Sequence, residues 1–219
     1  MEHFPVTRTD KGLHVEGFPD AVKIVRLASP GAKRLADLYL HRSDLEFADQ
    51  CLGAINGVPN DARIIRQALW RSAIIHFIKC FDATSARSEL SLDNIYEGEP
   101  SAVEAFNYFR NLRNKHLIHD ENAYSQSLPA AVLNGGDKTY KIEKIVCLSV
   151  LSETLEQENF SNLKLLIAKA RDWVIAEFVS LCNTLTKELE REPYPDLFSR
   201  EDLIVRVPTV DEISKRKRG

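Results

Sequence analysis

The sequence predicts a mainly α-helical protein, a bundle of four long helices with a small β-hairpin inserted between the third and the fourth. Three observations lead to this prediction. Four segments repeat apolar residues every three or four positions, the period of a helix with one buried face. Only nine glycines and nine prolines occur among 219 residues, so helix breakers are few. One stretch with a glycine turn, between the third and fourth segments, predicts the hairpin.

The first two helices follow an N-terminal arm. Residues 1–28 show no sustained period, so we expect an irregular or partly strand-like arm there. Ser29-Pro30 predicts a helix start, with serine as the N-cap and proline at the first helical position. Asn56-Gly57 predicts the end of this helix, and Pro59-Asn60-Asp61 is expected to cap the second. The bundle is therefore predicted to begin at residue 29.

The third helix and the hairpin come next. Ser101 and Glu104 have the spacing of a capping box, which predicts the start of the third helix. Beyond residue 122 the helical period ends, and two apolar runs flank Asn134-Gly135-Gly136-Asp137. Such an arrangement is typical of two antiparallel strands joined by a tight turn. We therefore expect a hairpin over about residues 130–148.

The fourth helix is the longest of the four. We expect it to start near Ser161, with Phe160 and Leu165 as a hydrophobic staple, and to stop before Pro193. The bundle is thus predicted over residues 29–190. Residues 191–219 are expected to form a loosely attached tail with a basic end.

Composition limits the class of protein. The net charge of −3 does not indicate a nucleic-acid binder, so any phosphate-binding surface has to be local. No apolar run approaches the length of a membrane span, and the N-terminus has no secretion signal. We therefore expect a cytoplasmic protein without a membrane partner. The four cysteines, Cys51, Cys80, Cys147 and Cys182, are widely spaced, which predicts reduced core thiols rather than a metal or redox site.

Residues 109–122 contain the densest group of reactive side chains. Two Arg-Asn pairs, Arg110-Asn111 and Arg113-Asn114, are each followed by a histidine six residues after the arginine. These histidines are His116 and His119. A guanidinium group holds phosphate oxygens with a fixed fork of donors, and histidine transfers protons near neutral pH. The stretch therefore points to phosphate chemistry.

A helical projection places part of this group on the buried face. With Phe109 at zero and about 100° per residue, Arg113 lies at about 40° and His116 at about −20°. Asp120 follows at about 20° and His119 at about −80°. A buried stripe that becomes ionic indicates either a functional site or a structural arrangement. In the structural arrangement, His116 is a hydrogen-bonded core residue and Arg113 pairs with Asp120.

The Arg-Asn-x4-His pattern at the end of a bundle helix resembles the HEPN superfamily (higher eukaryotes and prokaryotes nucleotide-binding). The string Leu112–Asp120 is most similar to the abortive-infection and toxin-like bacterial branch, and the order of helices agrees over about residues 30–190. The resemblance implies a HEPN-like helical bundle. It also implies a metal-independent endoribonuclease that needs no cofactor, acts on RNA, and has its site at the interface of a homodimer.

The resemblance also implies roles for individual residues. Arg113 would bind the scissile phosphate and stabilise its developing charge, and Asn114 would position the histidine or the phosphate. His119 would act as base or acid when the ribose 2′-hydroxyl attacks. We favour this register because it lies nearer the expected helix end and His119 lies off the buried stripe. His119-Asp120 also resembles the family's usual histidine followed by a polar residue, which favours the same register. The register Arg110-Asn111 with His116 fits the spacing equally well.

Partners and regulation follow from the same resemblance. A toxin or phage-defence effector of this type is held in check by an antitoxin protein, which in some pairs modifies a tyrosine two residues after the motif histidine. That position is Glu121 here, and the nearest tyrosine is Tyr124. Regulation by that modification is therefore not expected.

Two other functions remain open at this point. Many HEPN-like bundles bind RNA, nucleotides or proteins without cutting, and the negative net charge fits such a module. A helical metal phosphohydrolase is the other reading. His119-Asp120 would supply its ligand doublet, His76 or His116 an upstream ligand and Asp172 a distant one.

Overall fold

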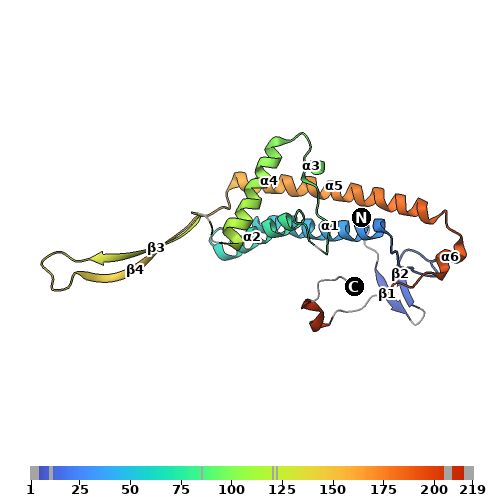
Figure 1. Ribbon diagram of the computed structural model, residues 1–219, viewed down its shortest axis with the longest axis horizontal. Helices are drawn as coiled ribbons and strands as arrows, with labels where there is room; N and C mark the ends of the chain where they lie inside the picture. The colour runs from blue at the N-terminus through green and yellow to red at the C-terminus, as the bar shows by residue number, and fades with distance from the viewer. Residues whose placement is uncertain are drawn as a thin grey trace. The chain divides into compact units, whose positions relative to one another are not determined.

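The computed structural model is mainly helical, as the sequence predicted (Figure 1). It describes residues 5–9, 12–84, 86–119, 121, 123–204 and 209–214, so Asp120 and the basic end at 215–218 lie outside the described residues. The long helices are α1 (Pro30–Ile55), α2 (Arg63–Lys79), α4 (Pro100–Leu112) and α5 (Gln157–Leu189). Shorter helices are α3 (Leu92–Ile95), η1 (Arg113–Ile118), α6 (Tyr194–Ser199) and η2 (Val210–Ser214). The strands are β1 (Val6–Thr9), β2 (Gly12–Val15), β3 (Ser125–Leu133) and β4 (Ile142–Leu151).

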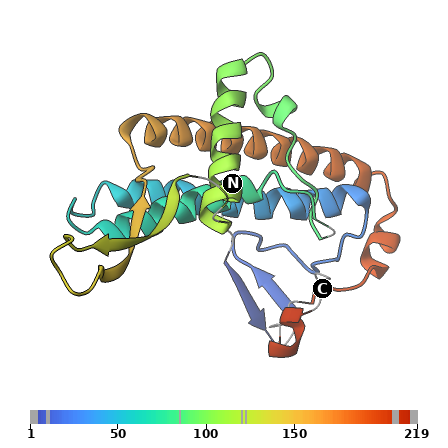
Figure 2. The same ribbon diagram turned by 60° about the vertical axis from the view of Figure 1, so that its left-hand side comes forward.

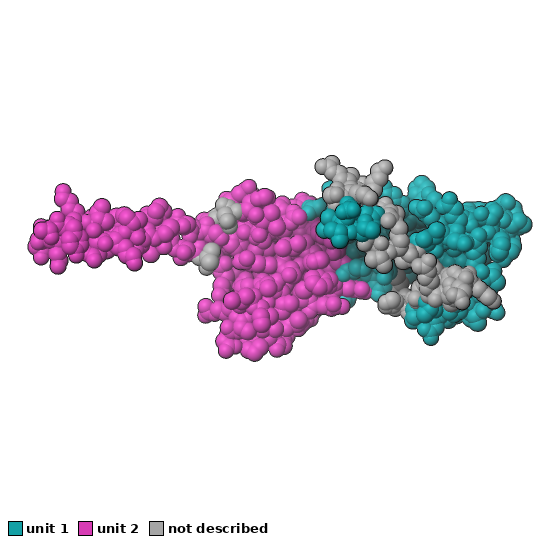
Figure 3. Space-filling view, turned by 90° about the horizontal axis from the view of Figure 1, so that it is seen from below, with its two compact units in different colours: residues 1–43, 82–90, 171–219 teal, residues 44–81, 91–170 magenta. Residues whose placement is uncertain are grey.

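Two compact units divide the chain (Figure 3). Unit 1 comprises residues 1–43, 82–90 and 171–219, and unit 2 comprises residues 44–81 and 91–170. Both units are discontinuous in sequence, so they do not coincide with the predicted arm, bundle and tail. Unit 2 contains the Arg-His stretch, the β3–β4 hairpin and most of the buried apolar side chains.

Aromatic side chains form the centre of the unit 2 core. Phe109 of α4 lies edge-on to Trp70 of α2, with ring centroids 6.0 Å apart. Phe106, one turn earlier, contacts Phe77 and Phe81 at 5.8 and 4.7 Å. All five rings are buried. Because α4 is fixed to α2 through these rings, the segment that follows α4 starts from a rigid position.

Unit 1 contains a group of buried polar side chains around Ser88. Asp37 accepts hydrogen bonds from both the amide and the hydroxyl of Ser88, at 3.1 and 2.8 Å. The imidazole Nε2 of His41 lies 2.8 Å from the Ser88 carbonyl oxygen and donates to it. Because Asp37 and His41 are one helical turn apart on α1, they hold Ser88 from the same face.

Within unit 1, the C-terminal segment is hydrogen-bonded to residues 23–26 of the N-terminal arm. The amide of Arg26 donates to the Glu201 carbonyl at 2.8 Å, and the amide of Leu203 donates to the Ile24 carbonyl at 2.9 Å. Lys23 also donates to two carbonyl groups at the end of α6. The prediction of a loosely attached tail is therefore wrong for residues 198–203. The N-terminal arm is partly strand-like as expected, since β1 and β2 pair antiparallel.

The helix ends differ in how well local rules predicted them. The Ser29 hydroxyl accepts from the Ala32 amide at 3.1 Å, which confirms the first cap. The capping box was wrong, because α4 starts at Pro100 and its N-cap, Glu99, makes no side-chain cap. The cap predicted for the second helix was also wrong, since Ala62 takes that position without a side-chain hydrogen bond. The predicted hydrophobic staple of Phe160 and Leu165 was wrong as well, because α5 starts at Gln157 and the Leu165 side chain is 70% exposed.

The β3–β4 hairpin is longer than predicted and extends away from the helices of its own unit (Figures 1 and 2). Its strands run antiparallel over Ser125–Leu133 and Ile142–Leu151, whereas about 130–148 was expected. The exposed thiol of Cys147 lies on β4, so the prediction of core thiols holds for Cys51 and Cys80 but not for this residue. Among the described residues, no helix is long and apolar enough to cross a membrane.

Candidate functional site

The Arg-His stretch lies where α4 changes its helical form. The α-helix ends at Leu112, and residues Arg113–Ile118 continue as the π-helix η1. A π-helix pairs residues five apart, is rare, and is frequent at functional sites. Its wider turn rotates each residue by less than the 100° of an α-helix. The predicted helical angles therefore hold only as far as Leu112.

Arg113 is the first residue of this π-helix and is half-buried. Its guanidinium Nη1 donates to the side-chain oxygen of Asn114 at 2.7 Å. The two neighbouring residues of the favoured register thus contact each other directly. The side-chain amide of Asn114 limits the motion of the Arg113 guanidinium, so Asn114 orients Arg113.

His119 lies just beyond the π-helix. Its backbone is extended, with φ −129° and ψ 134°, and its side chain is exposed. The amide of Glu121 donates to the carbonyl groups of Lys115 and His119, both at 2.9 Å, and closes the turn. The imidazole is therefore presented to solvent by a defined turn instead of lying at the margin of a continuing helix. Asp120, the proposed partner of Arg113 in the structural alternative, lies outside the described residues.

Residues of the other register make contacts within unit 2. The Arg110 guanidinium lies over the Phe106 ring, 5.0 Å from its centroid. His116 lies 3.4 Å from the Ser125 hydroxyl through Nδ1, and its ring centroid is 5.6 Å from that of Tyr124. Asn111 is exposed. Arg110 thus packs on α4, and His116 connects η1 to the start of β3.

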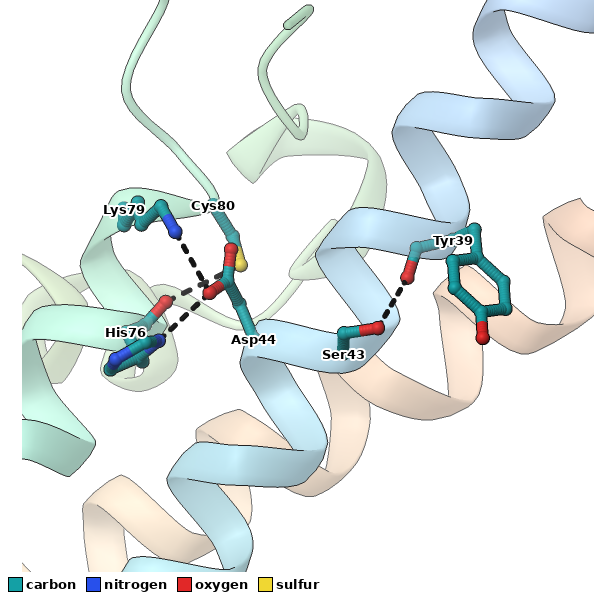
Figure 4. A network of polar contacts seen from close by, with 6 residues as sticks. All are labelled: Tyr39, Ser43, Asp44, His76, Lys79 and Cys80. Atoms are coloured by element: carbon teal, nitrogen blue, oxygen red, sulfur yellow. Dashed lines mark hydrogen bonds and ion pairs between the residues drawn. The ribbon is translucent and has the colours of Figure 1, made fainter. Parts of the chain in front are cut away.

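A second polar cluster, which the sequence did not single out as a group, joins α1 and α2 (Figure 4). The Asp44 carboxylate is nearly buried and accepts from Nδ1 of His76 at 2.8 Å and from Lys79 at 3.0 Å. The His76 ring also contacts Phe47, with centroids 4.5 Å apart. This bond to Asp44 occupies one ring nitrogen of His76, the residue proposed above as an upstream metal ligand.

A pattern in the sequence could have indicated these polar side chains. Asp37, His41 and Asp44 have the spacing i, i+4, i+7, and they alternate with the buried residues Leu38 and Leu45. Polar residues at this spacing on an apolar helix face have to find partners when the face is buried. No group of three or more His, Cys, Asp or Glu side chains in the described part of the chain could hold a metal ion.

Comparison of the chain with protein-family models, with curated proteins and with solved structures gave no match.

Proposed function

We propose that this chain is a metal-independent endoribonuclease of the HEPN type, with Arg113, Asn114 and His119 as the working residues. The main support is the arrangement at η1. A guanidinium held by an amide begins the π-helix, and an exposed imidazole follows its end. These two groups are the ones that RNA cleavage through the ribose 2′-hydroxyl requires.

The chemistry needs one proton removed and one proton supplied. The 2′-oxygen loses its proton, attacks the adjacent phosphorus, and displaces the 5′-oxygen of the next nucleotide, which takes up a proton. The products are a 2′,3′-cyclic phosphate and a 5′-hydroxyl. Arg113 stabilises the additional negative charge on the phosphate oxygens, and Asn114 orients the guanidinium. A neutral His119 removes the first proton, and a protonated one supplies the second.

One protomer offers one histidine of this register, and both proton transfers need a group. Pairing of two protomers, with both η1 segments lining one cleft, supplies two copies of Arg113 and His119. The homodimer is therefore part of this proposal. Such an activity would suit a cytoplasmic toxin or phage-defence effector that an antitoxin protein holds inactive.

The experiment is cleavage of total RNA in EDTA by the purified protein and four variants. His119→Ala is expected to lower the rate by about 10²–10⁴-fold and Arg113→Ala by about 10²–10³-fold. Arg110→Ala and His116→Ala are the matched controls, because they remove the same two residue types from the other register. They are expected to leave cleavage within about tenfold of the unsubstituted protein.

Each other outcome would change either the residues of the site or the function. Loss of cleavage with Arg110→Ala and His116→Ala, but not with the first pair, would move the site to the earlier register. Binding of RNA without cleavage would indicate the non-catalytic module. Cleavage that EDTA abolishes would favour metal-dependent hydrolysis and contradict the proposal.

A further inference from the structure

The β3–β4 hairpin exposes apolar side chains on both of its faces. The register places Leu128 opposite Leu148 on one face and Ala131 opposite Ile145 on the other. Leu128, Leu148 and Ile145 are 49%, 59% and 66% exposed. A hairpin of two strands alone is marginally stable in water, and large contiguous apolar surfaces indicate an interaction site. The part of the chain that the structure describes leaves both faces open.

The two outer edges of this hairpin differ in their capacity to pair. The Ser152 amide donates to the Tyr124 carbonyl at 2.9 Å, so the amides of alternate β4 residues, including Leu148, point towards β3. By the same alternation, Pro129 occupies a position of β3 whose amide would point outwards. Proline has no amide hydrogen, so the outer edge of β3 is interrupted at its middle.

The outer edge of β4 has no such interruption. The amides of Cys147 and Ser149 point away from β3, and the seven residues from Ile145 to Leu151 include neither proline nor a charged residue. The charged pair Glu143-Lys144 lies at the other end of the strand, towards the turn. An uncharged and continuous strand edge is a template for another strand.

We propose that the outer edge of β4 pairs with β4 of a second copy of this chain, antiparallel and around a two-fold axis at Leu148. Leu148 then lies opposite Leu148 of the partner subunit, and Cys147 exchanges backbone hydrogen bonds with the partner's Ser149. The result is one sheet of four strands in the order β3, β4, β4, β3. The proposal does not depend on ribonuclease activity, and the homodimer of the proposed function would be this same dimer, formed about the same two-fold axis.

Two properties of the hairpin favour a second copy over another partner. A two-fold contact has to be self-complementary, and the uncharged run places no like charges opposite each other. The joined sheet has more than the three strands that independent stability requires, whereas each hairpin alone has two.

A matched pair of proline substitutions tests the edge. Ser127 and Ser149 face each other in the register, and the amides of both point to their own outer edges. Ser149→Pro removes an amide from the β4 edge, and Ser127→Pro removes one from the β3 edge. Light scattering over a range of protein concentrations is expected to give a dimer for the unsubstituted chain and for Ser127→Pro. For Ser149→Pro it should show a rise of about tenfold or more in the dimer dissociation constant.

A cysteine pair tests the position of the axis. In a Cys147→Ser background, Leu148→Cys places two thiols at a pair that does not share hydrogen bonds, with Cα atoms about 4.5 Å apart. That distance lies within the range that a disulfide spans. Mild oxidation is expected to join the two protomers of the Leu148→Cys variant quantitatively through a disulfide between the two copies of residue 148. Leu133→Cys, on β3 and 72% exposed, is the matched control and should stay unlinked, as should the background alone.

Several results would overturn the inference. A monomeric mass for the unsubstituted chain at tens of micromolar would do so, whether the hairpin then binds membranes, RNA or another protein. Equal loss of the dimer in both proline variants, or linkage at residue 133 instead of 148, would also overturn it. His119→Ala is expected to keep the dimer, so a failed cleavage assay and a failed pairing assay can be told apart.

Discussion

The buried histidine of α1 makes the stability of the protein depend on pH. His41 has no exposed surface, and burial lowers its pKa from 6.5 to about 4. The positive charges of Arg87 and Arg34 lower the pKa further, while the Ser88 carbonyl and the Asp37 carboxylate oppose this change. His41 is therefore neutral in the folded protein at neutral pH.

The sign of the effect follows from comparing the folded and unfolded chains. The unfolded chain binds the proton near pH 6.5, and the folded chain binds it only near pH 4. Between these values the proton favours unfolding. The free energy of unfolding is therefore highest above about pH 6.5 and falls as the pH decreases towards 4. Linkage gives a loss of up to about 2 kcal/mol between pH 7 and pH 5.

Urea unfolding at pH 7 and pH 5 measures this loss. Most carboxylates stay ionised at pH 5, so His41 should dominate the change. His41→Gln is the comparison, because glutamine does not titrate and its amide can donate to the Ser88 carbonyl. The difference in unfolding free energy between the two pH values should shrink by up to about 2 kcal/mol in this variant. An equal pH dependence in both proteins would refute the reasoning, whatever the absolute stability of the variant.

Three further outcomes are expected. Asp44→Asn should lower the free energy of unfolding by about 1–3 kcal/mol in urea, because it removes the charge that accepts from His76 and Lys79, whereas Lys79→Met should cost less than about 1 kcal/mol. Phe109→Ala should lower the free energy of unfolding by about 3–5 kcal/mol in the same assay, since the ring is fully buried in the unit 2 core. A loss below about 1 kcal/mol would contradict the packing described. Asn114→Ala should slow RNA cleavage by about tenfold through a less ordered Arg113 while the melting temperature stays unchanged, and cleavage at the full rate would remove Asn114 from the site.

The elements that could be predicted are those that local chemistry determines. The first helix begins as the sequence indicated, because Ser29 and Pro30 act on the backbone beside them. It ends at Ile55, directly before Asn56-Gly57, as expected. The starts of α4 and α5 were misplaced, because Pro100 and Gln157 extend each helix beyond the capping patterns at residues 101 and 161. Several residues can start the same helix, and the packing of the whole helix selects among them.

For the candidate site, the sequence proposes residues, and the structure adds the geometry around them. Residue types and spacing are visible in the sequence, so Arg113, Asn114 and His119 could be named. The π-helix from Arg113 to Ile118 could not be predicted, because the angles were calculated for an α-helix throughout. The partners of Asp44 are on α2, 32 and 35 residues later, and only the fold brings them to it.

The discontinuity of unit 1 has a consequence for synthesis on the ribosome. Its first segment ends at Ser43, and its last begins at Arg171, so the ribosome has to add all of the intervening chain before the segments can meet. At about 5–20 residues per second this takes on the order of ten seconds. Leu38 lies in the first segment and is fully buried in the finished protein. During this time it does not yet have all of its final neighbours. All segments of unit 2 have been made once Ala170 is added, before the last segment of unit 1 begins.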